Sequence, residues 1–128
     1  MVYYINEAAV GGEVWNVVPF KSVGKIKFGD SKETVRKIFS KGYDCVPSPS
    51  KKVNGDRFID GDNRLFHVYY DKNDKVGSVG IYKGITVKYD GKTVFPMDKN
   101  DEKVDYRSTG IDQHSNMIQV DDKRYGEL

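Results

Sequence analysis

The chain has 128 residues, of which 38% are hydrophobic and 12% aromatic, and its 21 Lys and Arg against 19 Asp and Glu leave a formal net charge of +2. This length fits one small soluble domain over residues 1–128, and nine Tyr with six Phe supply large side chains for a core. The near balance of charge excludes an acidic mimic of DNA and argues against a nucleic-acid partner, because either role needs a large field of one sign.

Cysteine usage and the ends of the chain bear on its compartment. Cys45 is the sole cysteine, so the chain forms no internal disulfide and has no Cys-rich zinc site. The N-terminal stretch has no basic start, and Glu7 and Glu13 interrupt its short apolar run, which does not fit a secretory signal. No run approaches the ~20 apolar residues that cross a bilayer. We therefore expect a cytoplasmic protein with no membrane span, no metal and no cofactor.

Two short strands and the main helix are expected in the first third of the chain. The strands cover Val14–Phe20 and Lys25–Phe28, and the α-helix covers about residues 30–41. Asp30 is placed to cap the helix start and Gly42 to end it in a left-handed conformation. Three large apolar residues recur at i, i+3 and i+4: Val35, Ile38 and Phe39. So narrow a stripe does not sustain an isolated helix, so the helix must pack on a sheet.

Short strands and hairpins follow the helix. Residues 44–56 contain Pro and Gly without periodicity and are expected to form a loop. Strands at 65–70 and 75–82 flank a turn at 71–74, and strands at 85–89 and 92–95 flank Asp90-Gly91, a pair typical of a type I′ turn. A last strand is expected at 117–120. The prediction is an α+β fold, a mostly antiparallel sheet with the helix packed on one face.

The first hairpin predicts two different sheet faces. A turn at 71–74 pairs Phe66 with Val79, Val68 with Gly77 and Tyr70 with Lys75. That face is apolar, and we expect the helix to cover it. The opposite face mixes aromatic and polar groups and is left for solvent or a partner: Leu65, His67, Tyr69, Val76, Ser78, Gly80 and Tyr82.

Local charge is less even than the total. Residues 21–57 contain ten basic and four acidic side chains, a net charge of +6, whereas residues 98–128 contain five basic and eight acidic, a net charge of −3. Solvated faces that pair with one another account for this asymmetry. An anionic partner at the basic segment is the alternative interpretation.

No residue pattern in the sequence indicates a reaction. Cys45 lacks a recognisable base, because neither His67 nor His114 lies in a catalytic signature. The Asp-rich segments 60–63 and 71–74 depart from the calcium-loop pattern and are typical of turns. An enzymatic role would need the carboxylates of Asp56, Asp60 and Asp62 to converge in a cleft. We therefore expect a protein that is not an enzyme.

Several segments together resemble a known group of small bacterial proteins. That group opens with a Pro-Phe strand, continues with a Gly-x-Ile-x-Phe-Gly-Met-Ser-x-Glu-Glu-Val-Arg helix start and reaches a His-Val-Tyr-Tyr-Asp strand. The matching segments are Pro19-Phe20, Gly24–Phe39, His67–Asp71, Lys75-Val76 and Gly91–Pro96. Asp30 stands in place of the usual Met and Thr34 in place of the second Glu. The resemblance implies an immunity partner of a bacterial polymorphic toxin, and it assigns no binding residues.

The resulting functional hypothesis is a non-enzymatic immunity or inhibitor protein that occludes a toxin or effector. We expect its contact surface to consist of His67, Tyr69 and Tyr82, with Arg36 and Lys37 on the helix as an electrostatic rim. The alternative is a phage-type counter-defence protein that sequesters a small anionic nucleotide, for which the basic segment and its loop are the motivation. The sequence leaves the partner, the oligomeric state and the role of residues 98–128 open.

Overall fold

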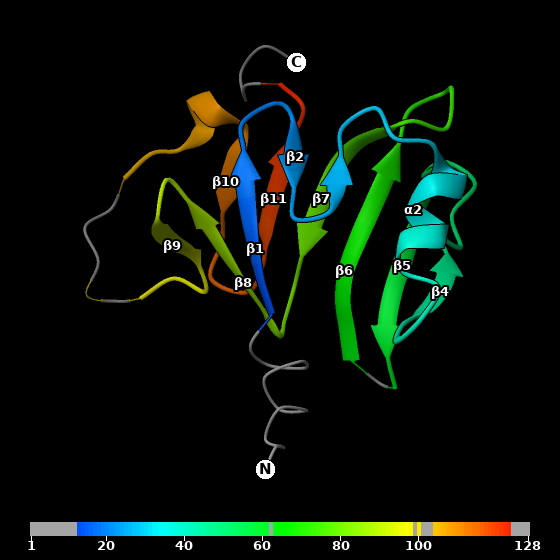
Figure 1. Cartoon of the computed structure of the whole chain (residues 1–128), viewed down its shortest axis with the longest axis horizontal. Coiled ribbons are helices and arrows are strands. Elements are labelled where there is room, and N and C mark those ends of the chain that lie inside the picture. Colours follow the sequence, from blue (N-terminus) through cyan, green and yellow to red (C-terminus); the bar gives the residue numbers. More distant parts are fainter. Residues whose placement is uncertain (1–12, 62, 99, 101–103, 124–128) are drawn as a thin grey trace.

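The computed structural model describes residues 13–61, 63–98, 100 and 104–123. Within these residues the chain forms eleven strands, one α-helix and one 3-10 helix, which confirms the expected α+β class (Figure 1). In chain order the elements are β1 (Glu13–Val18), β2 (Ser22–Val23), β3 (Ile26–Lys27), α2 (Lys32–Ile38), β4 (Asp44–Pro47), β5 (Gly55–Asp60), β6 (Asn63–Tyr70), β7 (Val76–Ile81), β8 (Ile85–Tyr89), β9 (Lys92–Phe95), η1 (Arg107–Thr109), β10 (Ile111–Gln113) and β11 (Ile118–Asp121).

The described strands make two sheets. The small sheet has the order β3-β2-β1-β8-β9, and the large sheet has the order β10-β11-β7-β6-β5-β4. Neighbours in the large sheet are all antiparallel, whereas β1 and β8 pair in parallel in the small sheet, with Glu13 opposite Ile85 and Val17 opposite Tyr89. The small sheet therefore joins the start of the described chain to its middle.

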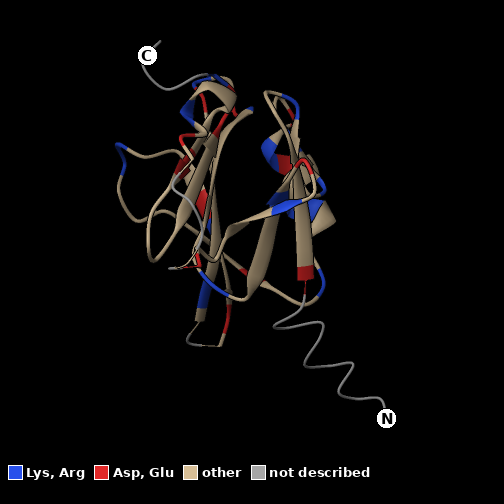
Figure 2. Cartoon of the chain, turned by 90° about the vertical axis from the view of Figure 1, so that its left-hand side faces the viewer, with Lys and Arg blue, Asp and Glu red and all other residues tan. Residues whose placement is uncertain are grey.

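The core lies between the two sheets, which stand as two layers in Figure 2. Trp15 of the small sheet contacts Phe66 of the large sheet, with ring centroids 4.7 Å apart. Phe58 stacks on Phe66, and Val87 faces them from the small sheet, all three with no exposed surface. Each such side chain contributes about 1.5–3 kcal/mol through burial, so the packing of the sheets on one another dominates the stability.

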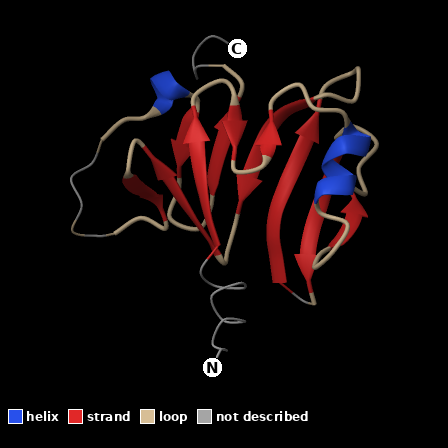
Figure 3. Ribbon diagram, viewed as in Figure 1, coloured by secondary structure: helices blue, strands red, loops and turns tan. Residues whose placement is uncertain are grey.

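Helix α2 lies beside the small sheet, over the β4–β5 end of the large sheet, while η1 lies at the other end of the molecule (Figure 3). It is shorter than the predicted helix over about residues 30–41 and begins at Lys32, because Ser31 rather than Asp30 is its N-cap and accepts a hydrogen bond from the Thr34 amide. Asp30 instead accepts one from the Lys27 amide. Of the predicted apolar stripe, Val35 and Phe39 are buried, but Ile38 is exposed.

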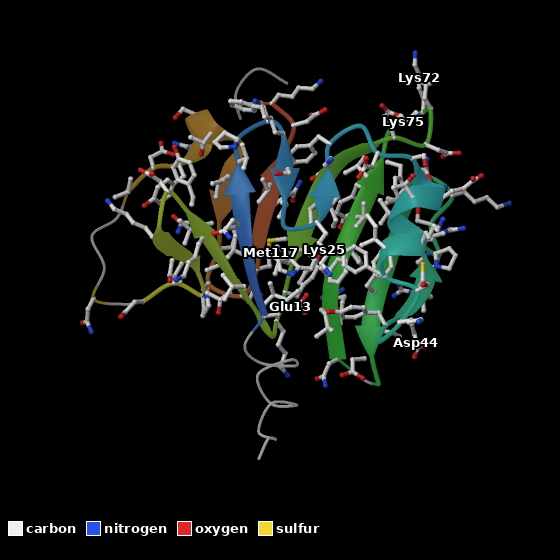
Figure 4. All side chains as sticks on the ribbon, viewed as in Figure 1. Glu13, Lys25, Asp44, Lys72, Lys75 and Met117 are labelled. Carbon is white, nitrogen blue, oxygen red and sulfur yellow. The ribbon has the colours of Figure 1, made fainter. Side chains whose placement is uncertain are left out.

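The aromatic ring of Phe39 attaches the end of α2 to the core. Its ring centroid lies 4.9 Å from that of Phe66 and 5.4 Å from that of Phe58, and it also stacks on Trp15. Tyr43 packs on Phe39, and its hydroxyl donates to Glu13, which is labelled at the start of β1 in Figure 4. The helix thus covers the apolar face of the large sheet, as expected.

The loop predicted at residues 44–56 was wrong at both ends. Residues 44–47 form β4, the edge of the large sheet, and β5 begins at Gly55. The pairing sets Cys45 opposite Phe58 and Pro47 opposite Asp56. Pro47 is tolerated because an edge strand leaves one side without a partner. The short β2 and β10 were missed as well, since two or three residues carry no period.

The predicted register of the β6–β7 hairpin was wrong by about two residues. Phe66 pairs with Ile81, Val68 with Val79 and Tyr70 with Val76. A bulge at Tyr69/Tyr70 accounts for one of these two residues, and Val76 faces the core, where it is 2% exposed. Because a shift of two residues preserves the alternation, the assignment of His67 and Tyr69 to the outer face was nevertheless correct.

The remaining hairpin and the C-terminal strand were confirmed. β8 and β9 have the predicted bounds, and Asp90 and Gly91 between them have φ values of 52° and 77°, as a type I′ turn requires. The strand expected at 117–120 is β11, one residue later.

Candidate functional site

The outer face of the large sheet turns away from the small sheet and from α2. Strand alternation sends Phe58, Phe66 and Val68 into the core, so their neighbours along the strands project to the other side. Arg57 pairs with His67 across β5 and β6, and His67 pairs with Gly80 across β6 and β7. The sheet therefore places these three positions in one row on its outer face.

Three aromatic side chains gather on this face and are called the aromatic cluster: His67, Tyr69 and Tyr82. The ring centroid of His67 lies 5.4 Å from that of Tyr69 and 5.3 Å from that of Tyr82, with both pairs close to perpendicular. His67 Nδ1 and the Tyr69 hydroxyl are hydrogen-bonded at 2.7 Å. All three are half-buried. The structure thus brings together the three aromatic residues that the sequence predicted as a contact surface.

Gly80 provides the floor beneath these rings. A Cβ at this position would lie 3.4 Å from Cε of Met117 and 3.7–3.8 Å from ring atoms of Tyr82 and Tyr69. Met117, labelled in Figure 4, precedes β11 and borders the cluster from the neighbouring strand. The lack of a side chain at Gly80 lets the two tyrosines and Met117 lie over the strand. The cluster is therefore an apolar surface with polar atoms at its rim.

Two arginines flank the aromatic cluster. The guanidinium carbon of Arg64 lies 4.1 Å from the centroid of the Tyr82 ring, a cation–π contact. Arg57 lies beside His67 in the register of the sheet. Neither arginine has a carboxylate within ion-pair distance among the described residues, whereas Arg36 and Arg107 each bind one. The cluster therefore has a positively charged border.

The charges around His67 determine its protonation. Burial and the positive charges of Arg64 and Arg57 lower the pKa of His67 to about 4, so the ring is neutral at pH 7. Burial, together with the contact to Tyr82, raises the pKa of Tyr69 to about 12. Neither side chain is a suitable general base near neutral pH, because such a base needs a pKa close to the working pH. The aromatic cluster is therefore suited to binding through van der Waals contacts and hydrogen bonds.

The far end of the same face is acidic. Ser78 and Gln119 donate hydrogen bonds to Asp121, which is 7% exposed. On the neighbouring strand β10, Asp112 is hydrogen-bonded to His114, which directly follows that strand. The face therefore runs from basic at β5 and β6, across the aromatic cluster, to acidic at β11 and β10.

The predicted rim residues on the helix do not border the aromatic cluster. Arg36 Nε and Nη2 bind the two carboxylate oxygens of Asp56 at 2.9 and 2.8 Å, on the inner face of the sheet. Lys37 is exposed on α2. The cations that do flank the cluster, Arg57 and Arg64, were missed because both lay between the expected loop at 44–56 and the expected strand at 65–70, where no strand was predicted. The pairing of β5 with β6 was the missing information.

Asp56 and Asp60, two of the three carboxylates considered for an enzymatic site, do not converge. Asp56 is fully buried and also accepts a hydrogen bond from the Tyr70 hydroxyl at 2.8 Å. Asp60 is exposed at the end of β5, and Asp62 lies outside the described residues. Cys45 is opposite Phe58 and so points away from the face of His67, and burial, with the nearby Asp56, raises the pKa of its thiol. This environment does not activate a thiolate.

A small pocket lies near η1 and β10. It has a volume of about 160 Å³ and is lined by residues 104–107 and 111–113. Asp105 and Asp112 are among them, and Asp105 is paired with Arg107. No group of three metal-ligating side chains occurs within the described ranges.

Comparison with known proteins gave no relative. No family model matches the chain, and neither a curated protein nor a solved structure matches it. No helix in the described part of the chain is long and apolar enough to cross a membrane.

Proposed function

We propose that the chain is a non-enzymatic binding protein, an immunity or inhibitor protein that covers a toxin or effector with the outer face of its large sheet. The aromatic cluster with its two flanking arginines carries this proposal. Tyr and Arg are enriched among the residues that dominate binding energy at protein interfaces, because they offer large, partly rigid area and directed hydrogen bonds. The resemblance to toxin immunity proteins supports the same function.

The position of the cluster also favours a protein partner. Tyr69 and Tyr82 are held by sheet pairing and by contacts to His67, so little conformational entropy is lost when they bind. A protein with charges of opposite order would match the basic and acidic ends of the face.

The test is a pair of matched double variants. Tyr69→Ala with Tyr82→Ala removes two rings of the cluster, and Val14→Thr with Val18→Thr alters exposed side chains of β1 instead. Tagged proteins are incubated with the purified product of the adjacent gene, and affinity is measured by calorimetry. We expect the tyrosine variant to bind at least roughly 100-fold more weakly, with a nearly unchanged melting temperature, and the valine variant to bind normally.

Two outcomes would contradict the proposal. If native lysate yields no stoichiometric protein partner for the wild-type chain, the protein-binding function is wrong. A large drop in melting temperature of the tyrosine variant would show instead that Tyr69 and Tyr82 stabilise the fold.

A second candidate function is the sequestration of a small anionic nucleotide. Arg57 and Arg64, which pair with no carboxylate of the described residues and lie next to rings that could stack on a base, favour it. Against it, the pocket near η1 and β10 is lined by Asp105 and Asp112, which repel phosphate. Mass spectrometry of the heat-released extract of purified protein tests this candidate, since a sequestering protein carries its ligand through purification.

A further inference from the structure

The outer face of the small sheet carries exposed apolar side chains on its central strand, β1. Strand alternation sends Trp15 and Val17 into the core, so Val14 and Val18 project to the opposite side. There they are 48% and 46% exposed, which shows that no described element packs over them. Because the core lies between the two sheets, this face and the aromatic cluster lie on opposite sides of the molecule.

The turn after β1 holds Phe20 in a left-handed backbone conformation. The Lys21 amide donates to the Val18 carbonyl, which closes a turn with Pro19 and Phe20 at its central positions. Phe20 has a φ of 64°, which glycine adopts freely and a bulky residue adopts rarely. Its ring is not fixed in the core in exchange, since it is 40% exposed. Backbone strain of this kind gathers at functional positions, so the exposed ring points to a contact outside the chain.

Positive charge surrounds the exposed apolar residues. The pairing of β3 with β2 and of β2 with β1 puts Lys27 in one row with Val18, and the pairing of β1 with β8 puts Lys88 level with Asn16. One acid, Asp90, lies at the border in the β8–β9 turn. Within residues 13–61, 63–98, 100 and 104–123, four lysines of this face and of the turns around β2 have no carboxylate within ion-pair distance: Lys21, Lys25, Lys27 and Lys88.

We propose that the outer face of the small sheet binds the surface of an anionic phospholipid membrane, with the Phe20 ring among the headgroups and the four lysines against them. Each lysine near an anionic lipid surface adds to the attraction, and exposed apolar side chains add burial at the boundary. The inference does not rest on the proposed function, because the aromatic cluster on the other side stays free for a protein.

The type of cation favours lipid over the other occupants of such a face. A lysine ammonium is a point charge on a flexible stem, which suits mobile phosphate groups, whereas lysine is depleted at protein interfaces and arginine is enriched. A second copy of the chain fits poorly, because a symmetric contact would bring the same lysines against one another.

The direct experiment is co-sedimentation of the whole chain with lipid vesicles. One set consists of phosphatidylcholine alone and the other of phosphatidylcholine mixed with phosphatidylserine. We expect saturable binding to the mixed vesicles, little binding to the neutral ones, and release by high salt, because salt screens the lysines from the headgroups. Absence of binding, or equal binding to both sets, would overturn the proposal.

Matched charge variants locate the binding face. Lys27→Gln with Lys88→Gln should weaken binding to the mixed vesicles at least roughly tenfold. Lys72→Gln with Lys75→Gln removes the same charge at the β6–β7 turn, where both side chains are exposed, and should bind like the wild type (Figure 4). Equal loss in the two double variants would show a general charge effect and contradict the proposal.

Phe20→Gly tests the ring without endangering the fold. Glycine accepts a φ of 64°, so the melting temperature should stay unchanged or rise, while vesicle binding should weaken about fivefold. Unchanged binding of this variant would remove Phe20 from the contact and overturn the proposal. Soluble polyglutamate should displace the protein from vesicles poorly, because it offers charge without an apolar layer. Efficient displacement would overturn the lipid surface in favour of an acidic protein.

Discussion

Asp56 connects helix α2 to the large sheet. Its carboxylate is fully buried and accepts hydrogen bonds from Arg36 and Tyr70. Burial by itself raises the pKa of Asp56, but the hydrogen bonds from Arg36 and Tyr70 outweigh it, so the pKa lies below the usual 3.8. The ionised form therefore ties α2 to β5 and β6.

The protonation of Asp56 gives a pH-dependent prediction. Asp56→Asn should lower the free energy of unfolding by about 2 kcal/mol at pH 7, because charged hydrogen bonds are replaced by weaker ones. Since folding lowers this pKa, the stabilisation is present above the unfolded-state pKa of about 3.9 and is lost as pH falls through the folded-state pKa. The difference between wild type and variant should hold at pH 7 and 5 and shrink below about pH 4, as measured by urea unfolding.

The control for that prediction is Asp105→Asn, which alters an exposed ion pair with Arg107. Such pairs contribute little because water screens them. A difference for Asp56→Asn that stays constant down to pH 3 would show that the charge of Asp56 is not what stabilises the fold.

At the level of residues, the sequence predicted the three members of the aromatic cluster but not the two arginines that flank it. His67 and Tyr69 alternate with buried positions on one strand, so their common face follows from periodicity. Tyr82 joins them because the register error was an even number of residues. Arg57 reaches the same face only through the pairing of β5 with β6, and no local signal at residues 55–60 indicated a strand.

Among the elements, helix α2 has its start specified locally, although by a different residue from the one expected. The Ser31 Oγ accepts a hydrogen bond from the Thr34 amide at 3.1 Å and is also hydrogen-bonded to the Thr34 hydroxyl. Asp30 satisfied the sequence pattern equally well, because either residue type can cap. Which residue caps the helix depends on the chain that precedes it. There the Asp30 carboxylate accepts a hydrogen bond from the Lys27 amide, and the Asp30 backbone carbonyl accepts one from the Val76 amide.

Removal of the Ser31 side chain, the N-cap of α2, should lower the stability of the fold by a measurable amount. Ser31→Ala should lower the free energy of unfolding by about 1 kcal/mol, because an amide at the helix start loses its acceptor. Thermal or urea unfolding measures the change. The control is Ser40→Ala, which removes an exposed hydroxyl just after the helix that donates a hydrogen bond to the Lys37 carbonyl. This variant should lower the free energy of unfolding less than Ser31→Ala does. Equal effects of the two variants would argue against Ser31 as the cap.

For the whole molecule, the sole tryptophan lies where the two sheets and α2 meet. Trp15 is 3% exposed and contacts Phe66 of the large sheet and Phe39 after the helix. Large apolar residues were recognisable on each predicted strand, but the sequence carried no indication of which strands face one another across the core. Packing between sheets depends on their twist and topology, which hydrophobic periodicity does not encode.

The position of Trp15 predicts cooperative unfolding. Its fluorescence reports contact between the sheets, and far-ultraviolet circular dichroism reports the strands. In urea both signals should give the same midpoint, because the sheets share one core and neither buries its inner face alone. A fluorescence transition that precedes the dichroism transition would show that the sheets separate before they unfold.

The parallel pairing of β1 with β8 has a consequence for synthesis in the cell. Glu13 and Trp15 leave the ribosome long before Ile85 and Val87, their partners in the small sheet. Contacts between distant segments form slowly, because the intervening chain must be closed into a loop first. The hairpins of the large sheet are complete earlier, apart from β11 and β10. Trp15 should therefore stay exposed on the nascent chain until β8 emerges, and stalling translation just before residue 85 should leave a chain that chaperones still bind.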